Sequence, residues 1–132
     1  MFDQLSLFSQ PSAPLTVRAV TGRIRAAFDR EPLFQNLWVE GEVTNYTRAS
    51  SGHIYFTLKD AGAQIACVVW RAQASGMAYL PASGDQVIVH GRISLYEQGG
   101  KYQIYVDLIQ PAGRGTLYAE FERLKAKLQV EG

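Results

Sequence analysis

Five strand-like segments, separated by turn-forming residues, constrain the fold of this chain more than any other feature. They cover residues 37–47, 53–60, 64–71, 85–97 and 101–110. The alternation is clearest in the second segment, where Ile54, Phe56 and Leu58 share one side, as in a strand with one buried face. Turn chemistry lies between the segments, at residues 50–52, 61–62, 83–85 and 98–100. The sequence therefore predicts five antiparallel strands.

The fourth segment, DQVIVHGRISLYE, is long and has Gly91 at its centre. A residue without a side chain lets a strand bend sharply, so that one strand takes part in both sides of a small barrel. Five antiparallel strands with such a bend predict a closed Greek-key barrel of the oligonucleotide/oligosaccharide-binding type, the OB-fold. The expected fold class is mainly β.

Helical periodicity flanks the predicted barrel on both sides. Apolar residues recur at helical spacing from Val17 to Phe28, with Thr16 placed as the N-cap and Pro32 as the end of an amphipathic helix. A second apolar stripe predicts the start of a connecting helix over residues 114–132. We therefore expect a flexible tail over residues 1–14, one barrel domain over residues 15–113, and this helix.

Composition excludes several classes of protein. The formal net charge of +1 argues against coating duplex DNA by bulk electrostatics, so any nucleic-acid site must be local. A single cysteine, Cys67, excludes an internal disulfide and favours a cytoplasmic location, and with only His53 and His90 beside it no zinc ligand set forms. We expect no metal or cofactor here. Apolar runs are too short for a signal peptide or a membrane span.

Aromatic and basic side chains occupy the outward positions of the predicted sheet and its loops. A single-stranded nucleic acid is held by bases stacking on aromatic faces and by cations that follow its phosphates. The predicted nucleic-acid-binding residues are Tyr46, Arg48, His53, Tyr55, Lys59, Trp70, Arg92, Tyr96 and Lys101. The alternation also turns Tyr105 outward. The alternative for each aromatic residue is a place in the core or at the lip of the barrel.

Three segments carry a specific resemblance: WVEGEVTN, SGHIYFTLKD, and GRISLYE before the glycine turn. With them, residues 15–128 resemble the amino-terminal domain of the exodeoxyribonuclease VII large-subunit family. The resemblance implies a single-stranded DNA-binding barrel in a large subunit that assembles with several copies of a small helical subunit. It also implies that the assembly degrades single-stranded DNA from both ends to oligonucleotides, with hydrolytic residues beyond Gly132. The fragment alone is then expected to be inactive.

Two other functions fit the same architecture. A barrel of this kind can pack on neighbouring subunits while other parts of the assembly hold DNA. It can also read RNA, as anticodon-binding barrels do, since the fold is shared between these functions. The sequence leaves both alternatives open.

The amino-terminal tail contains a second resemblance. Gln4, Leu5, Leu7 and Phe8, in the run QLSLF, resemble the short peptide by which bacterial replication and repair proteins dock on the sliding clamp. That resemblance implies that the glutamine is hydrogen-bonded while Leu7 and Phe8 fill an apolar pocket. Exposed apolar side chains on a tail are costly unless a partner receives them. The alternative is a tail without a partner.

Overall fold

The structure, a computed structural model, describes residues 13–112. Most of the predicted tail over residues 1–14 lies outside this range, including the clamp-like peptide. The predicted connecting helix over residues 114–132 also lies outside the described residues. Within residues 13–112, no helix is long and apolar enough to cross a membrane.

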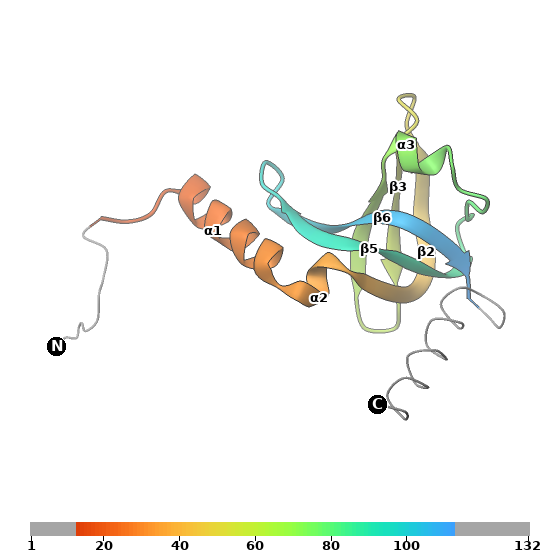
Figure 1. Ribbon diagram of the computed structural model, residues 1–132, viewed down its shortest axis with the longest axis horizontal. Coiled ribbons are helices and arrows are strands. Elements are labelled where there is room, and N and C mark those ends of the chain that lie inside the picture. Colours follow the sequence, from red (N-terminus) through yellow and green to blue (C-terminus); the bar gives the residue numbers. More distant parts are fainter. Residues whose placement is uncertain (1–12, 113–132) are drawn as a thin grey trace, which may run out of the picture.

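Five strands form a closed barrel, as the sequence predicts (Figure 1). The strands are β2 (Leu37–Arg48), β3 (Ile54–Lys59), β4 (Gln64–Val69), β5 (Gln86–Tyr96) and β6 (Lys101–Pro111). Around the barrel they follow the order β2-β3-β4-β6-β5, and β5 pairs with β2 to close the ring. The mainly β OB-fold is therefore confirmed, and each strand begins and ends within two residues of its predicted bounds.

One pair of strands corrects the expectation of a wholly antiparallel sheet. Strands β4 and β6 pair in parallel, with Cys67 opposite Ile104 and Val68 opposite Tyr105. The other four pairs are antiparallel. In a closed ring with an odd number of strands, directions cannot alternate throughout, so at least one neighbouring pair must be parallel. Closure of the barrel therefore requires a parallel pair, which the local sequence pattern does not reveal.

Gly91 allows β5 to serve both sides of the barrel. Strand β5 pairs with β2 only from Gln86 to Gly91, whereas its pairing with β6 continues to Tyr96 across an irregularity between His90 and Gly91. A Cβ atom at Gly91 would lie 2.2 Å from the carbonyl oxygen of Tyr105. Glycine is needed here because the neighbouring backbone comes too close for any side chain.

The barrel interior is filled by apolar side chains from all five strands. In β3 the burial alternates as predicted, with Ile54, Phe56 and Leu58 inside. Cys67 is buried among them, and burial raises the pKa of its thiol to about 12. This thiol is therefore a group of the hydrophobic core.

A bulge in β2 changes which of its side chains face the core. Thr44 lies opposite Thr57 and Thr47 opposite Tyr55, so that two residues of β2 face one residue of β3, Phe56. The extra residue is Asn45, whose φ of 54° lies in the left-handed region that asparagine tolerates. After the bulge, the strand's alternation is inverted.

Helix α1 (Val17–Arg30) projects from the barrel beside the hairpin between β5 and β6 (Figure 1). It begins as predicted, with the Thr16 hydroxyl accepting a hydrogen bond from the amide of Ala19 at 3.0 Å. Its carboxyl-terminal half contacts the hairpin, where the Ser94 hydroxyl donates to the Asp29 carboxylate at 3.0 Å. The first turns extend past the barrel.

Two one-turn helices complete the described chain. Helix α2 (Pro32–Gln35) follows α1 directly and was not predicted, because Pro32 was interpreted only as the end of a helix. Proline also fits the first position of a new helix, and Glu31 caps α2 by accepting from the amide of Leu33 at 3.3 Å. Helix α3 (Arg71–Ala74) directly follows β4 and begins the connection to β5.

Candidate nucleic-acid interface

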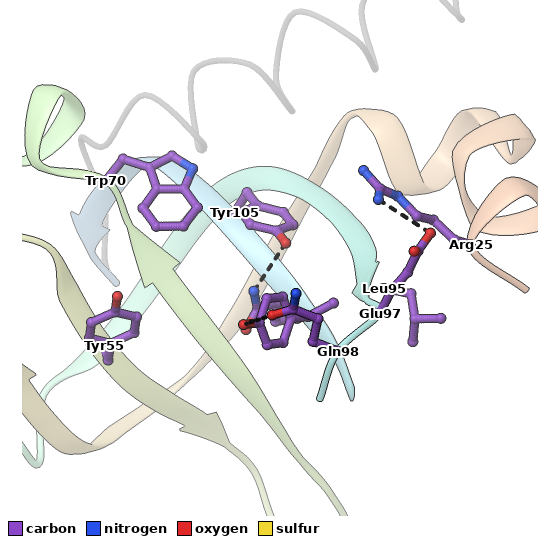
Figure 2. A pocket seen from close by; sticks show the side chains of 9 residues that line it. Arg25, Tyr55, Trp70, Leu95, Glu97, Gln98 and Tyr105 are labelled. Atoms are coloured by element: carbon purple, nitrogen blue, oxygen red, sulfur yellow. Dashed lines mark hydrogen bonds and ion pairs between the residues drawn. The ribbon is translucent and has the colours of Figure 1, made fainter. Parts of the chain in front are cut away.

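A pocket of about 610 Å³ opens on the outer face of the barrel, between the sheet, the β5–β6 hairpin and α1. This volume lies in the range of sites that hold small organic ligands, which suits a nucleotide. Its lining residues are Arg25, Tyr55, Trp70, Leu95, Tyr96, Glu97, Gln98, Gln103 and Tyr105. Figure 2 shows Tyr55 and Trp70 toward one end and Arg25 and Glu97 at the other, with Tyr105 between them.

Strand register places the aromatic residues of the pocket in one row. Tyr55 on β3 is opposite Val68 on β4, which in turn is opposite Tyr105 on β6, and Tyr105 is opposite Arg92 on β5. Residues directly opposite one another on adjacent strands share a face of the sheet. Val68 is only 1% exposed although it points outward, because it lies between two tyrosine-bearing strands. The row therefore has an apolar floor between two aromatic rings.

Trp70 lies next to this row, two residues after Val68 at the end of β4 and on the same outer face. Its ring centroid lies 5.8 Å from that of Tyr105 with the planes 31° apart, and 5.0 Å from the ring of His53 in an edge-to-face arrangement. The Nδ1 atom of His53 accepts a hydrogen bond from the amide of Arg71 at 2.9 Å. This bond ties the residue before β3 to the start of α3 and fixes one ring against the indole. Trp70 nevertheless remains 43% exposed, which leaves surface for a stacked base.

Positive charge and amide groups surround the rings. The guanidinium of Arg92 lies 4.6 Å from the centroid of the Tyr105 ring, a cation–π contact. The Gln103 amide donates to the Tyr105 hydroxyl at 3.1 Å, and the Tyr96 hydroxyl donates to the Gln98 side-chain oxygen at 3.2 Å. Figure 2 shows the polar groups of the pocket between the aromatic end and Arg25. The pocket thus offers ring faces for bases, hydrogen-bonding groups for their edges and cations for phosphates.

The structure brings five of the nine predicted binding residues together. Tyr55, Trp70 and Tyr96 line the pocket. Arg92 borders it in a smaller adjoining pocket that also includes Trp70 and Tyr105, and His53 contacts Trp70.

The other four predicted residues lie elsewhere. Tyr46 lies within β2. Because of the bulge, its ring stacks on that of Phe56, with the centroids 6.4 Å apart, and packs against the core. Lys59 is at the opposite end of β3 from His53, in a pocket with Glu42 and Asp60. Arg48 is exposed at the end of β2, and Lys101 is exposed at the start of β6.

Six residues of the pocket are absent from the list predicted from the sequence: Arg25, Leu95, Glu97, Gln98, Gln103 and Tyr105. Alternation already turned Tyr105 outward, so its omission ignored an available signal. The two glutamines carried no signal, since glutamine is common on any solvated face or turn. Arg25 lies on the first helix, and nothing in the local sequence indicated that this helix meets the β5–β6 hairpin.

Metal-binding side chains do not cluster in the described part of the chain. Among residues 13–112, no three or more His, Cys, Asp or Glu side chains come together in a group able to hold a metal ion.

Curated relatives match most of this chain. Proteins named exodeoxyribonuclease 7 large subunit are 49% identical over 118 residues in Geobacter metallireducens and 47% identical over 118 residues in Pseudomonas savastanoi pv. phaseolicola. The matched part is 89% of this chain, and 26% and 25% of the respective relatives. A third protein of that name, from Koribacter versatilis, is 43% identical over 132 residues, 98% of this chain and 29% of its own length. The sequence resemblance is therefore confirmed, and the chain spans about a quarter of these relatives.

Solved structures share the fold at low sequence identity. The S. pombe Stn1-ten1 complex has a TM-score of 0.51 at 14% identity, covering 74% of this chain and 71% of the matched chain. The second single-stranded DNA binding protein of Mycobacterium smegmatis has a TM-score of 0.50 at 19% identity, covering 59% and 86%. These likenesses establish the barrel architecture alone.

A family model described as an OB-fold nucleic acid binding domain matches residues 15–110. The match covers α1 and nearly all of the barrel, including every residue that lines the candidate pocket. The matched residues therefore correspond to the closed barrel and the helix that precedes it. The chain therefore belongs to the family of OB-fold nucleic-acid-binding domains.

Proposed function

We propose that this chain is the single-stranded DNA-binding module of the large subunit of an exodeoxyribonuclease of the exodeoxyribonuclease VII type. The observation that carries the proposal is that Tyr55, Trp70 and Tyr105 share one pocket on the outer face, with Arg92 over the Tyr105 ring. The names of the relatives and the family match support the same function.

The geometry favours a single strand over a duplex. Aromatic rings in an open pocket bind by stacking on the faces of bases, which contributes about 1–3 kcal/mol per base. In a duplex, these faces are already stacked on neighbouring base pairs. Because few cations surround the pocket, we expect modest affinity and a shallow dependence on salt.

Binding of the isolated chain to fluorescently labelled oligonucleotides tests this proposal. Anisotropy titrations should show binding to single-stranded DNA, weaker binding to duplex DNA, and a loss of affinity of about 5- to 150-fold in Trp70→Ala, the equivalent of one stacked base. An RNA oligonucleotide of the same sequence should compete less well than DNA. No binding, or equal binding to single strand and duplex, would contradict the proposal, and preferential binding of RNA would favour an anticodon-type function.

Hydrolysis belongs, in this proposal, to parts of the longer protein outside the present sequence. The chain covers about a quarter of the length of the curated relatives. The other three quarters of such a protein could carry the catalytic residues and the contacts with the small helical subunit. The buried free thiol of Cys67 fits a reducing cytoplasm. We expect no degradation of labelled single-stranded DNA by this chain, with or without magnesium. Release of oligonucleotides by the purified chain would disprove this division of labour.

A role in subunit contact is the second candidate, and the exposed apolar stripe of α1 favours it. Val17, Val20 and Ile24 recur at helical spacing and are 81%, 41% and 44% exposed. Apolar stripes on a helix normally face another element. Size measurements with and without the small helical subunit, paired with a DNA titration, separate this function from DNA binding.

The amino-terminal peptide extends the proposal to a bacterial sliding clamp. Gln4, Leu5, Leu7 and Phe8 lie outside the described residues, so the support is the sequence pattern alone. A peptide of residues 2–10 should bind a bacterial clamp in calorimetry, and the same peptide with Leu7→Ala and Phe8→Ala should not. Indistinguishable isotherms would end this part of the proposal.

A further inference from the structure

Among residues 13–112, Arg25 is the one cation that lines the pocket, and it is already paired. Its Nη1 atom lies 3.4 Å from Oε2 of Glu97, and its Nε atom lies 3.8 Å from Oδ2 of Asp29 (Figure 2 shows the pair with Glu97). Both partners of the Arg25–Glu97 pair line the pocket. A carboxylate therefore occupies the position beside Arg25 that an anion entering the pocket would take.

The two halves of this pair come from elements that are held together independently of it. Asp29 accepts from the buried Ser94 hydroxyl at 3.0 Å, and the rings of Phe28 and Tyr102 lie 6.3 Å apart. These contacts fix α1 against the β5–β6 hairpin one helical turn after Arg25. Opening the Arg25–Glu97 pair therefore leaves the helix in place, and the guanidinium stays at the edge of the pocket.

The Arg25–Glu97 pair is weak enough to be exchanged. The two side chains are 51% and 41% exposed, and an exposed ion pair changes an equilibrium by a factor of about five at most. A phosphate offers the guanidinium a bidentate partner with the geometry that arginine recognises best. A strand whose bases stack on Trp70 and Tyr105 carries such phosphates into this pocket.

We propose that Glu97 is an internal competitor for the phosphate backbone of single-stranded DNA. When DNA binds, Arg25 exchanges the Glu97 carboxylate for a phosphate, and Glu97 thereby lowers the affinity of the pocket for DNA. This inference rests on the proposed function, since it requires a single strand in the pocket. It makes Arg25, on α1, a binding residue, and Glu97, on the hairpin, a residue that restrains binding.

Four variants test the exchange: Glu97→Gln, Arg25→Gln, the double variant, and Glu40→Gln as a control. Glu40 is an exposed carboxylate on β2 outside the pocket, so its loss makes the same change in net charge. Anisotropy titrations with a single-stranded DNA oligonucleotide are run from 50 to 200 mM salt. Circular dichroism and urea unfolding check that each variant is folded.

We expect Glu97→Gln to bind single-stranded DNA about two- to fivefold more tightly than wild type at 50 mM salt. Glu40→Gln should bind as wild type does. Arg25→Gln should bind more weakly, with a salt slope smaller by about 0.7, the value for one phosphate contact on a single strand. In the double variant the gain from removing Glu97 should disappear, because its partner is absent.

The sign of the Glu97→Gln effect is decisive. Weaker or unchanged binding would overturn the inference, since the pair would then only position the hairpin, while binding by the wild-type chain would leave the proposed function intact. A gain that persists in the Arg25→Gln background, or that Glu40→Gln reproduces, would show general repulsion and also overturn it. Absence of binding by every variant and by wild type would refute the proposed function and the inference with it.

Discussion

Two aromatic residues of neighbouring strands, Tyr46 and Tyr55, face opposite environments. Tyr55 is 44% exposed in the pocket on the outer face, whereas Tyr46 stacks on Phe56 and packs against the core. Both were predicted to touch nucleic acid. The difference arises from one extra residue, Asn45, which inverts the alternation of β2 just before Tyr46. A single bulge thus decides whether a tyrosine stabilises the fold or is available to a ligand.

Two basic residues that were predicted to bind nucleic acid, Arg92 and Lys59, also lie in different environments. The guanidinium of Arg92 lies over the Tyr105 ring beside the pocket, whereas Lys59 lies at the other end of β3, in a pocket that Glu42 and Asp60 also line. Two carboxylates near Lys59 reduce its attraction for a phosphate. We therefore expect a phosphate contact from Arg92 and not from Lys59, although both side chains are basic and point outward.

The largest contrast is expected in stability. Tyr46→Ala should lower the free energy of unfolding by about 2–4 kcal/mol, because it removes a ring packed against the core. Tyr55→Ala should lower it by less than about 1 kcal/mol, since its side chain is largely solvated. Urea unfolding of the two variants measures both values. Equal losses would mean that the bulge does not separate the two tyrosines.

Binding should show the opposite order. Trp70→Ala should weaken binding of single-stranded DNA by about 1–3 kcal/mol, the contribution of one stacked base. Tyr46→Phe keeps the ring in the core and should leave affinity unchanged. Anisotropy titrations under one salt condition compare them, with unfolding curves as a check on folding. Loss of affinity in Tyr46→Phe alone would move the interface to the β2–β3 loop.

A smaller effect should distinguish the two cations. Arg92→Gln should reduce the slope of log affinity against log salt by about 0.7, because one phosphate contact is lost. Lys59→Gln makes the same change in charge and should leave the slope unaltered. Titrations of both variants at several salt concentrations give the slopes. The reverse result would place the backbone of the strand over the far end of β3.

The smallest effect concerns the turn that supports β2 near Tyr46. Asp85 accepts from the amide of Ala82 at 3.0 Å and from the Tyr79 hydroxyl at 2.8 Å, and these bonds hold the pKa of the Asp85 carboxyl below its usual range. A lowered folded-state pKa contributes stability above the ordinary value, about 4, that is lost as pH falls through the lowered value. Burial and, to a lesser extent, the hydrogen bond to the Asp85 carboxylate and its charge raise the pKa of Tyr79 to about 12. The Tyr79 hydroxyl therefore keeps the proton that it donates to Asp85 at neutral pH.

Asp85→Asn should therefore be less stable than wild type at pH 5–7, and the difference should shrink below about pH 4. Unfolding midpoints across this range measure the change, and DNA binding at pH 7 should be unchanged because Asp85 lies outside the pocket. A difference in stability that is independent of pH would show that the carboxylate is not the stabilising species.

Much of the architecture followed from local pattern. Alternation in β3 predicted which residues are buried, Thr16 predicted the start of α1, and Gly91 predicted the bend of β5. Alternation also turned Tyr55, Arg92 and Tyr105 outward, although Tyr105 was left off the list of binding residues. The bulge at Asn45 and the parallel pair of β4 and β6 were not predicted, since each depends on a neighbouring strand. The helix after Pro32 was not predicted because Pro32 was interpreted only as the end of α1.

The sequence by itself determined the strands, the type of barrel and, except at the end of β2, which faces of the strands are buried, because a period of two and the chemistry of turns act over a few residues. Tertiary structure alone decided that Trp70 lies 5.8 Å from Tyr105 and that Arg25 reaches the same pocket. These residues are separated by 35 or more positions in the chain. Their meeting depends on strand order, register and the docking of α1, which are set by closure of the whole barrel.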